Sequence, residues 1–198
     1  VAKDGATNSA ISGPFTFTVD ISVAAATLSL PANNSCTNDT TPTFDWSDVV
    51  DGCGVFYDLF IDGALVPGAA NLSASTYTLA PGEALLEGSH TWFVRSKDGA
   101  GNTTDSATFT VVIDLTNPSA FNLLTPPNGQ CGTGTPTFTW QASDGTPTTC
   151  GVTYRIQVDD DNTFATPVID QAGLTTTSFT AGTPLASGVT YYWRVTAT

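Results

Sequence analysis

The chain has 198 residues, with 18 Asp and Glu against 5 Lys and Arg, and a net charge of −13 at pH 7. Nucleic acids and anionic membranes both attract basic surfaces, so this composition speaks against either as a partner. Lys, Arg and Glu are scarce and Met is absent, whereas Gly, Pro, Ser and Thr are abundant, which favours short strands and turns over helices.

No apolar run approaches the roughly 20 residues that a membrane-spanning helix needs, and the opening VAKDGATNS lacks the apolar core of a signal peptide. Position 1 is not Met. We therefore expect a mature product or an internal segment, without membrane insertion in this stretch. Any targeting signal or anchor would lie outside it.

The opening stretch VAKDGATNSAISGPFTFTVDIS matches VRSKDGAGNTTDSATFTVVIDLT, which begins at Val94. The beginning of this second stretch also matches the end of the chain, WRVTAT. Lys3, Lys97 and Thr198 occupy equivalent places, 94 and 101 residues apart. This interval is the size of one β-sandwich domain. The chain is therefore expected to be a repeat array.

Two units follow the opening stretch, and their strands share a period of two. PANNSCTNDTTPTFDW pairs with PPNGQCGTGTPTFTW, and CGVFYDLFIDG pairs with CGVTYRIQVDD. Alternate positions are apolar, which indicates strands with one buried face. The positions expected to face the core are Phe44, Trp46, Tyr57, Leu59, Ile61, Trp92, Val94, Phe109, Val111 and Ile113 in the first unit and Phe138, Trp140, Tyr154, Ile156, Val158, Tyr191, Trp193 and Val195 in the second.

The repeat boundaries predict three segments with a permuted terminal strand. Residues 1–22 correspond to the last strand of a preceding repeat, residues 23–117 to a complete sandwich, and residues 118–198 to a sandwich that lacks its last strand. An open sheet edge invites pairing with another chain. We expect the apolar residues of the first segment in one copy to close the incomplete core of another, with Phe15, Phe17 and Val19 as donor residues and Tyr191, Trp193 and Val195 as acceptor residues.

The stretches TPTFDW, TPTFTW, GVTYRIQVDDDNTF, PLASGVTYYWRVTAT and KDGAGN resemble the immunoglobulin-like, fibronectin type III-like repeats found in tandem in prokaryotic extracellular surface proteins. The resemblance covers nearly the whole chain and implies tandem antiparallel immunoglobulin-like β-sandwiches. It does not fix a function, because this sandwich serves in stalks, adhesins, sugar-binding modules and enzyme spacers.

Four cysteines occur as one pair per unit, Cys36 with Cys53 and Cys131 with Cys150. Close CxxC pairs typical of zinc sites are absent, so disulfides in an oxidising, extracytoplasmic compartment are the interpretation. Two pairings remain open. The local pattern joins 36–53 and 131–150, whereas sandwich topology allows Cys36 to meet Cys150, and Cys131 to meet Cys53 of the following subunit.

Catalysis and metal binding have little support in the sequence. His90 is the single histidine, and no nucleophile or orienting partner is apparent around it, so we predict neither an enzyme nor a cofactor. The oxygens of Asp159, Asp160 and Asp161 could bind Ca²⁺, but their spacing lacks the DxDxDG pattern. A polar turn is the simpler explanation.

Four Asn-x-Ser/Thr sequons lie in loop-like stretches of the first unit and predict glycosylation candidates at Asn33, Asn38, Asn71 and Asn102.

Three functions are compatible with these observations. The first is a structural subunit of an extracellular filament or cell-surface stalk, assembled from copies of itself head to tail by strand complementation or covalent continuity. The second is an adhesin or carbohydrate-binding module, for which the outward aromatic candidates are Phe56, Phe60, Phe93 and Tyr192. The third is a non-catalytic spacer of a secreted enzyme.

Overall fold

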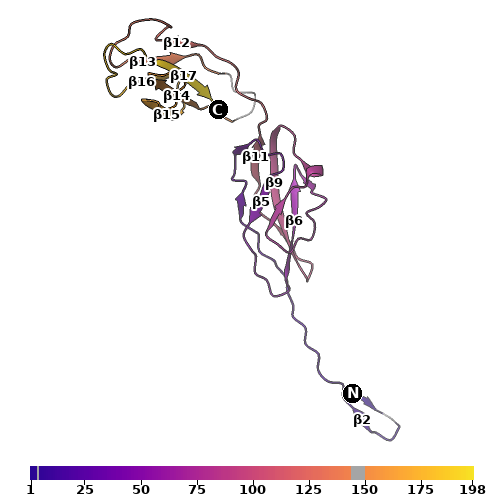
Figure 1. The fold of residues 1–198 in the computed structure, drawn as a ribbon. Coiled ribbons are helices and arrows are strands. Elements are labelled where there is room, and N and C mark those ends of the chain that lie inside the picture. The colour runs from indigo at the N-terminus through magenta and orange to yellow at the C-terminus, as the bar shows by residue number, and fades with distance from the viewer. Residues whose placement is uncertain (4, 144–149) are drawn as a thin grey trace. The chain divides into compact units, whose positions relative to one another are not determined.

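A computed structural model describes residues 1–3, 5–143 and 150–198, and its described elements are strands apart from one 3-10 turn, Pro81–Glu83. The predicted all-β class is therefore confirmed (Figure 1). Residue contacts define two compact units, one formed by residues 1–30, 43–78 and 92–108 and the other by residues 31–42, 79–91 and 109–198.

The first sandwich has a sheet of three strands and a sheet of six. The small sheet has the order β3-β5-β8, and the large sheet has the order β4-β11-β9-β6-β7, with β10 also paired to β9. The pairing of β4 with β11 is parallel, whereas β9 pairs antiparallel with β6 and β10. The strands are β3 (Leu28–Leu30), β4 (Ser35–Thr37), β5 (Thr43–Trp46), β6 (Val55–Ile61), β7 (Ala64–Leu65), β8 (Thr76–Thr78), β9 (Gly88–Asp98), β10 (Thr103–Asp105) and β11 (Phe109–Ile113).

The core of this sandwich is aromatic and follows the predicted period of two. Phe44 and Trp92 are fully buried and meet edge to face, with ring centroids 4.9 Å apart. Trp46 and Tyr57 form a second edge-to-face pair. The Tyr57 hydroxyl accepts a hydrogen bond from the Val49 backbone amide, which satisfies the polar end of this buried ring.

The second sandwich has two three-stranded sheets, with the orders β12-β13-β16 and β15-β14-β17. Its core consists of Phe138, Trp140, Tyr154, Ile156, Val158 and Ala181. The strands are β12 (Leu123–Thr125), β13 (Thr137–Trp140), β14 (Tyr154–Asp159), β15 (Ile169–Leu174), β16 (Ser178–Thr180) and β17 (Tyr192–Ala197).

The opening segment forms a small hairpin of β1 (Ala2–Lys3) and β2 (Ser9–Ala10) and then continues without a strand through residues 11–27. The sequence predicts a strand through Phe15, Phe17 and Val19, and the single chain does not form it. A strand requires a partner for its backbone hydrogen bonds. Among the described residues, no strand pairs with residues 11–19, and the side chains of Phe15, Phe17 and Val19 are exposed.

Candidate functional site

The closed edge of the first sandwich shows how a complete repeat ends. Strand β11 lies beside β9 in the large sheet and also pairs in parallel with β4, with Val112 opposite Cys36. Val111 and Ile113 on β11 are fully buried, as are Trp92 and Val94 on β9. The last strand of the repeat therefore closes the edge of β9 in the large sheet.

The second sandwich has the same pairing between its two long strands, β14 and β17, as the first sandwich has between β6 and β9. Ile156 pairs with Val195 on β17, as Leu59 pairs with Val94 on β9. Among the described residues, β17 pairs only with β14, so its other edge is open. Trp193 and Val195 are accordingly half-buried, whereas Trp92 and Val94, at the equivalent positions, are fully buried.

The segment of the second repeat that is equivalent to β4 forms no strand. Residues 130–132 of the second repeat correspond to Ser35–Thr37, yet they form no strand, and Cys131 is exposed. Strand β4 exists because β11 gives it hydrogen-bond partners. Among the described residues, no equivalent of β11 pairs with residues 130–132, and they form a loop.

The opening segment resembles β11 and the hairpin before it in sequence. Its residues 1–22 match residues 95–116 at a constant offset of 94, without a gap. The hairpin register is the same in both, because Lys3 pairs with Ser9 as Lys97 pairs with Thr103. Phe15 and Phe17 are 97% and 88% exposed, respectively. The structure of one chain does not bring these donor residues to Tyr191, Trp193 and Val195.

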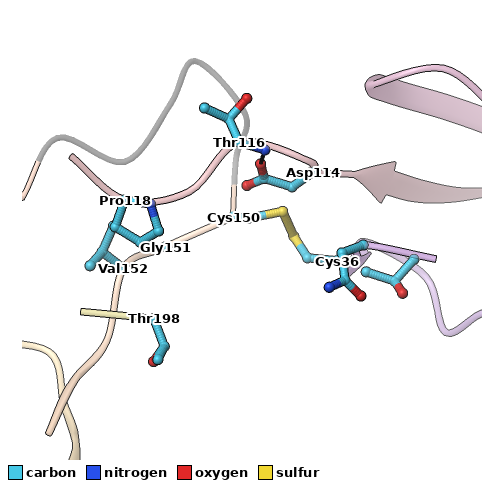
Figure 2. Close-up of a pocket in the computed structure, with 10 residues that line it drawn as sticks. Cys36, Asp114, Thr116, Pro118, Cys150, Gly151, Val152 and Thr198 are labelled. Atoms are coloured by element: carbon cyan, nitrogen blue, oxygen red, sulfur yellow. Dashed lines mark hydrogen bonds between the residues drawn. A yellow bond between two sulfur atoms is a disulfide. The ribbon is translucent and has the colours of Figure 1, made fainter. Parts of the chain in front are cut away.

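One disulfide joins the two repeats. Cys36 and Cys150 are bonded, with their Cα atoms 5.8 Å apart, while Cys53 and Cys131 are free thiols (Figure 2). Of the two patterns left open by the sequence, this is the one that crosses repeats. A shallow pocket surrounds the bond, within the compact unit of residues 31–42, 79–91 and 109–198. Asp114 also lines this pocket, and its carboxylate accepts a hydrogen bond from the Thr116 amide.

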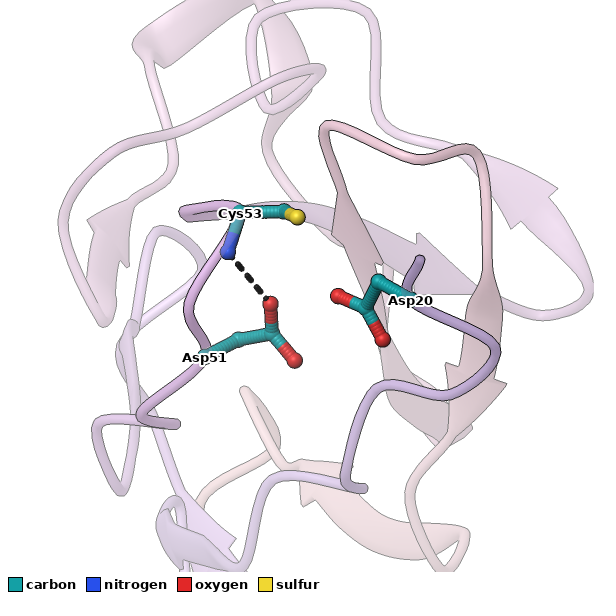
Figure 3. A group of neighbouring side chains, drawn as sticks. All are labelled: Asp20, Asp51 and Cys53. Carbon is teal, nitrogen blue, oxygen red and sulfur yellow. Dashed lines mark hydrogen bonds between the residues drawn. The ribbon is translucent and has the colours of Figure 1, made fainter. Parts of the chain in front are cut away.

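The free thiol of Cys53 lies beside two carboxylates. Potential ligand atoms of Asp20, Asp51 and Cys53 are within 4.8 Å of one another (Figure 3). The Asp51 carboxylate accepts a hydrogen bond of 2.8 Å from the Cys53 amide. The Asp20 carboxylate accepts a hydrogen bond from the Cys53 thiol, and this bond, together with burial and the nearby negative charges, raises the pKa of the thiol. A cluster of two carboxylates and one thiol does not by itself identify a metal site.

Sequence reasoning missed Asp20 as a neighbour of Cys53. The repeat contains a signal for it, because Asp20 is equivalent to Asp114 at the offset of 94 residues, and Cys53 is equivalent to Cys150. Each carboxylate, at the end of one repeat, therefore lies near the second cysteine of the repeat that follows. In one repeat the cysteine is bonded, and in the other it is free.

The weak calcium candidates are not gathered around a common point. Asp159 is 1% exposed, and its carboxylate accepts a hydrogen bond from the Asp160 amide. Asp160 and Asp161 are exposed, and the Asp161 carboxylate accepts from the Thr163 amide, as in a polar turn. Among the described residues, the grouping of metal-ligating side chains that the structure shows is the one around Cys53.

The four sequon asparagines lie on the first repeat in different surroundings. Asn33, Asn38 and Asn71 are exposed, whereas Asn102 is half-buried. The Asn102 side-chain amide, which is the nitrogen that a glycan would occupy, donates a 2.7 Å hydrogen bond to Asp98. A glycan at this position would replace one of the two hydrogens on this nitrogen and crowd the contact with Asp98, so the three exposed sites are better placed.

His90 and the outward aromatic residues have local structural partners. The ring of half-buried His90 forms a 2.9 Å hydrogen bond with the Leu86 carbonyl. Phe60 and Phe93 stack on each other with centroids 4.7 Å apart, and the Arg95 guanidinium lies 5.0 Å from the Phe60 centroid. Phe56 and Tyr192 are each 44% exposed. The rings of Phe60 and Phe93 therefore stack on each other and do not lie side by side as a flat surface for a sugar.

Two families of immunoglobulin-like domains match the chain. Residues 22–115 match the family described as "Bacterial Ig-like domain", and residues 123–198 match the "Rha78A-like, N-terminal immunoglobulin domain". The chain is a tandem of immunoglobulin-like repeats. The predicted resemblance and sandwich fold are thus confirmed. Domains of these families are generally non-catalytic and act as structural or surface modules, and the bacterial ones are often extracellular.

Solved structures show only distant similarity. The central fibronectin-III array of RIM-binding protein is 17% identical over 91% of this chain and 59% of that one, with a TM-score of 0.35. Dimeric latent PorU from Porphyromonas gingivalis is 17% identical over 88% of this chain and 18% of that one, with a TM-score of 0.34. The chicken interferon gamma receptor alpha chain is 10% identical over 90% and 89%, with a TM-score of 0.35.

This chain therefore spans 59% and 18% of the length of the first two structures. At these TM-scores the similarities carry no weight for function or assembly. No curated protein sequence matches the chain. Within the described residues, no helix has the length and apolar character needed to cross a membrane.

Proposed function

We propose that this chain is a structural repeat of an extracellular filament or surface stalk, and that residues 11–21 of one copy complete the second sandwich of another. The observation that carries the proposal is the open edge of β17 beside half-buried Trp193 and Val195. The same molecule exposes an apolar segment that matches the strand closing the first sandwich. Copies joined in this way form a head-to-tail array, because donor and acceptor are different surfaces.

Side-chain volumes support the match between donor and acceptor. Leu79 in the first core corresponds to Ala181 in the second, since each amide donates to the carbonyl of the equivalent proline, Pro42 or Pro136. The second core thus has a smaller residue at this place. The donor carries Phe17 where the first closing strand carries Val111, so it brings a larger side chain to the core that has the smaller residue at position 181.

The covalent chemistry supports a location outside the cytoplasm. The Cys36–Cys150 bond joins sequence positions 114 residues apart, and such bonds persist in oxidising compartments. A disulfide between repeats also resists separation of those repeats under pulling force. The net charge of −13 keeps an exposed array soluble and speaks against nucleic acid as a partner.

Concentration-dependent assembly tests the proposal. Sedimentation velocity of the full chain in reductant is expected to show growing linear oligomers with rising concentration. Phe17→Asp places a charge in the donor strand and is expected to leave monomers. Val50→Asp is the matched control, because Val50 is 96% exposed and lies outside the donor segment. Monomers of the unaltered chain at all concentrations, or equal loss in both variants, would refute strand donation.

Strand complementation and covalent continuity place the same strand on the same edge and differ in which polypeptide supplies it. A denaturing gel of the native material in reductant separates them. Separate subunits give a band near the 20.5 kDa of this chain, whereas a continuous stalk gives a much larger product. The adhesin and spacer alternatives have no specific observation in their favour, since two of the outward aromatic residues are paired with each other.

A further inference from the structure

The bonded cysteines of one repeat show where the free cysteines should meet. In the first sandwich, Val112 of β11 lies opposite Cys36 of β4, and the Asp114 amide donates to the Thr37 carbonyl. Just beyond β11, the chain enters the next repeat, in which Cys150 bonds to Cys36. The closing strand, the first cysteine of its own repeat and the second cysteine of the following repeat therefore form one arrangement.

The constant offset of 94 residues transfers this arrangement to the donor strand. Thr18 is equivalent to Val112, and Asp20 is equivalent to Asp114. A donor strand in this register places Thr18 opposite Cys131 of the acceptor copy. Residues 130–132 of the acceptor then gain the parallel partner that they lack in the single chain, as β4 has in β11.

The chain that donates the strand also carries Cys53, the equivalent of Cys150. Asp20 directly follows residues 15–19, the equivalents of β11, and lies near Cys53 of its own chain, with their potential ligand atoms within 4.8 Å. A strand that places Thr18 at Cys131 of the acceptor therefore delivers Cys53 to the same place. We propose that Cys53 of one copy and Cys131 of the next form an intermolecular disulfide that locks the donated strand. This inference rests on the proposed strand donation and adds its register and its covalent bond.

Formation of the bond needs an oxidant, and the class we name is a low-molecular-weight disulfide such as oxidised glutathione. The thiolate of exposed Cys131 attacks one oxidant sulfur, breaks the oxidant S–S bond and releases one small thiolate. The Cys53 thiolate then attacks the Cys131 sulfur and displaces the second small thiolate. The two cysteine protons end on the two released thiols, and the two electrons lost by the cysteine sulfurs reduce the oxidant.

The environment of Cys53 favours this order. The hydrogen bond to Asp20, burial and the negative charges around it raise the pKa of the Cys53 thiol and so reduce its thiolate fraction. Cys53 is consequently the slower group for the first attack on a free oxidant. The Cys53 thiol reacts efficiently once strand donation holds it beside the mixed disulfide on Cys131, because the second step then takes place within one complex.

The experiment uses full chains treated with oxidised glutathione and run on non-reducing gels. The unaltered chain is expected to give a ladder of covalent oligomers that contain a Cys53–Cys131 peptide. Cys53→Ser and Cys131→Ser should each lose the ladder when treated alone. An equal mixture of these two variants should give a dimer and stop there, because each chain carries one half of the bond. Phe17→Asp should lose the ladder while keeping both thiols.

The outcomes separate the two proposals. Oligomers that assemble in reductant but never yield the Cys53–Cys131 peptide overturn the disulfide and leave strand donation standing. Absence of assembly in reductant for the unaltered chain and both serine variants overturns the proposed function. The disulfide inference also fails if Phe17→Asp cross-links as well as the unaltered chain, or if Cys53 and Cys131 pair within a monomer.

Discussion

Phe17→Ala should weaken assembly strongly, although it shortens a single side chain. Phe17 is 88% exposed in the single chain, whereas Val111 at the equivalent place on β11 is fully buried. Strand donation would therefore take nearly the whole ring out of water. Alanine keeps the strand and its backbone hydrogen bonds and removes only the ring, so the experiment isolates side-chain burial.

The expected magnitude follows from core substitutions. Truncation of a fully buried Phe to Ala costs about 3–5 kcal/mol, because transfer free energy is lost and a cavity remains. We take the lower bound of about 3 kcal/mol because a peripheral strand can relax toward the cavity. This value corresponds to a dissociation constant raised by roughly 150-fold.

Sedimentation equilibrium in reductant measures this change directly, since reductant prevents any covalent contribution from Cys53 and Cys131. Val50→Ala serves as the control, because Val50 is 96% exposed and lies outside the donor segment. Its dissociation constant should stay within about twofold of the unaltered chain. A Phe17→Ala chain that associates within about threefold of the unaltered chain would show that the ring is not buried on assembly.

Three further outcomes are expected. Iodoacetamide should modify Cys53 more slowly than Cys131 in the monomer, and Asp20→Asn should speed Cys53 because it removes the carboxylate that raises the thiol pKa; equal rates in both proteins would contradict this. The hydrogen bond from Arg155 lowers the pKa of Asp170 to about 2, below the roughly 3.9 of an unfolded Asp, so the stabilisation it gives is complete above about pH 4 and fades toward pH 2. An NMR titration should give that pKa, and Asp170→Asn should flatten stability between these pH values; a midpoint near 3.9 would count against it. Finally, Trp92→Ala should destabilise the first sandwich by about 3–5 kcal/mol, whereas Trp193→Ala should cost less in dilute monomer and more once chains assemble, as followed by denaturant unfolding at two concentrations.

Local patterns predicted much of the fold because each repeat carries the same strong signals twice. The alternation of Phe44 with Trp46 and of Phe138 with Trp140 correctly places all four rings in the two cores. The equivalence of Lys97 and Thr198 is borne out by the strand register, since Thr153 and Thr198 exchange backbone hydrogen bonds where Phe56 pairs with Lys97.

Other features depend on partners distant in sequence, and local patterns could not reveal them. The strand around Phe17 has the right alternation yet does not form, because alternation creates a strand only where a neighbouring strand supplies hydrogen bonds. The cysteine pairing also remained open, since spacing alone permits both patterns. The choice of Cys36–Cys150 depends on how β11 brings Cys36 to the end of its repeat.

Local sequence patterns also could not predict the contact between Asp20 and Cys53. It joins two residues 33 positions apart in sequence, and no local pattern around either one points to the other. The repeat offset provides the one sequence signal, and its meaning becomes clear only when the bonded partner, Cys150, is located beside Asp114.

Hydrogen exchange of the residue 15–19 amides at increasing concentration of the unaltered chain, in reductant, tests strand donation most directly. Strand donation predicts that these amides exchange freely in dilute monomer and become protected as chains associate, together with amides along residues 130–132. Phe17→Asp should abolish the protection of both segments. Association that leaves residues 15–19 unprotected at every concentration would contradict the account.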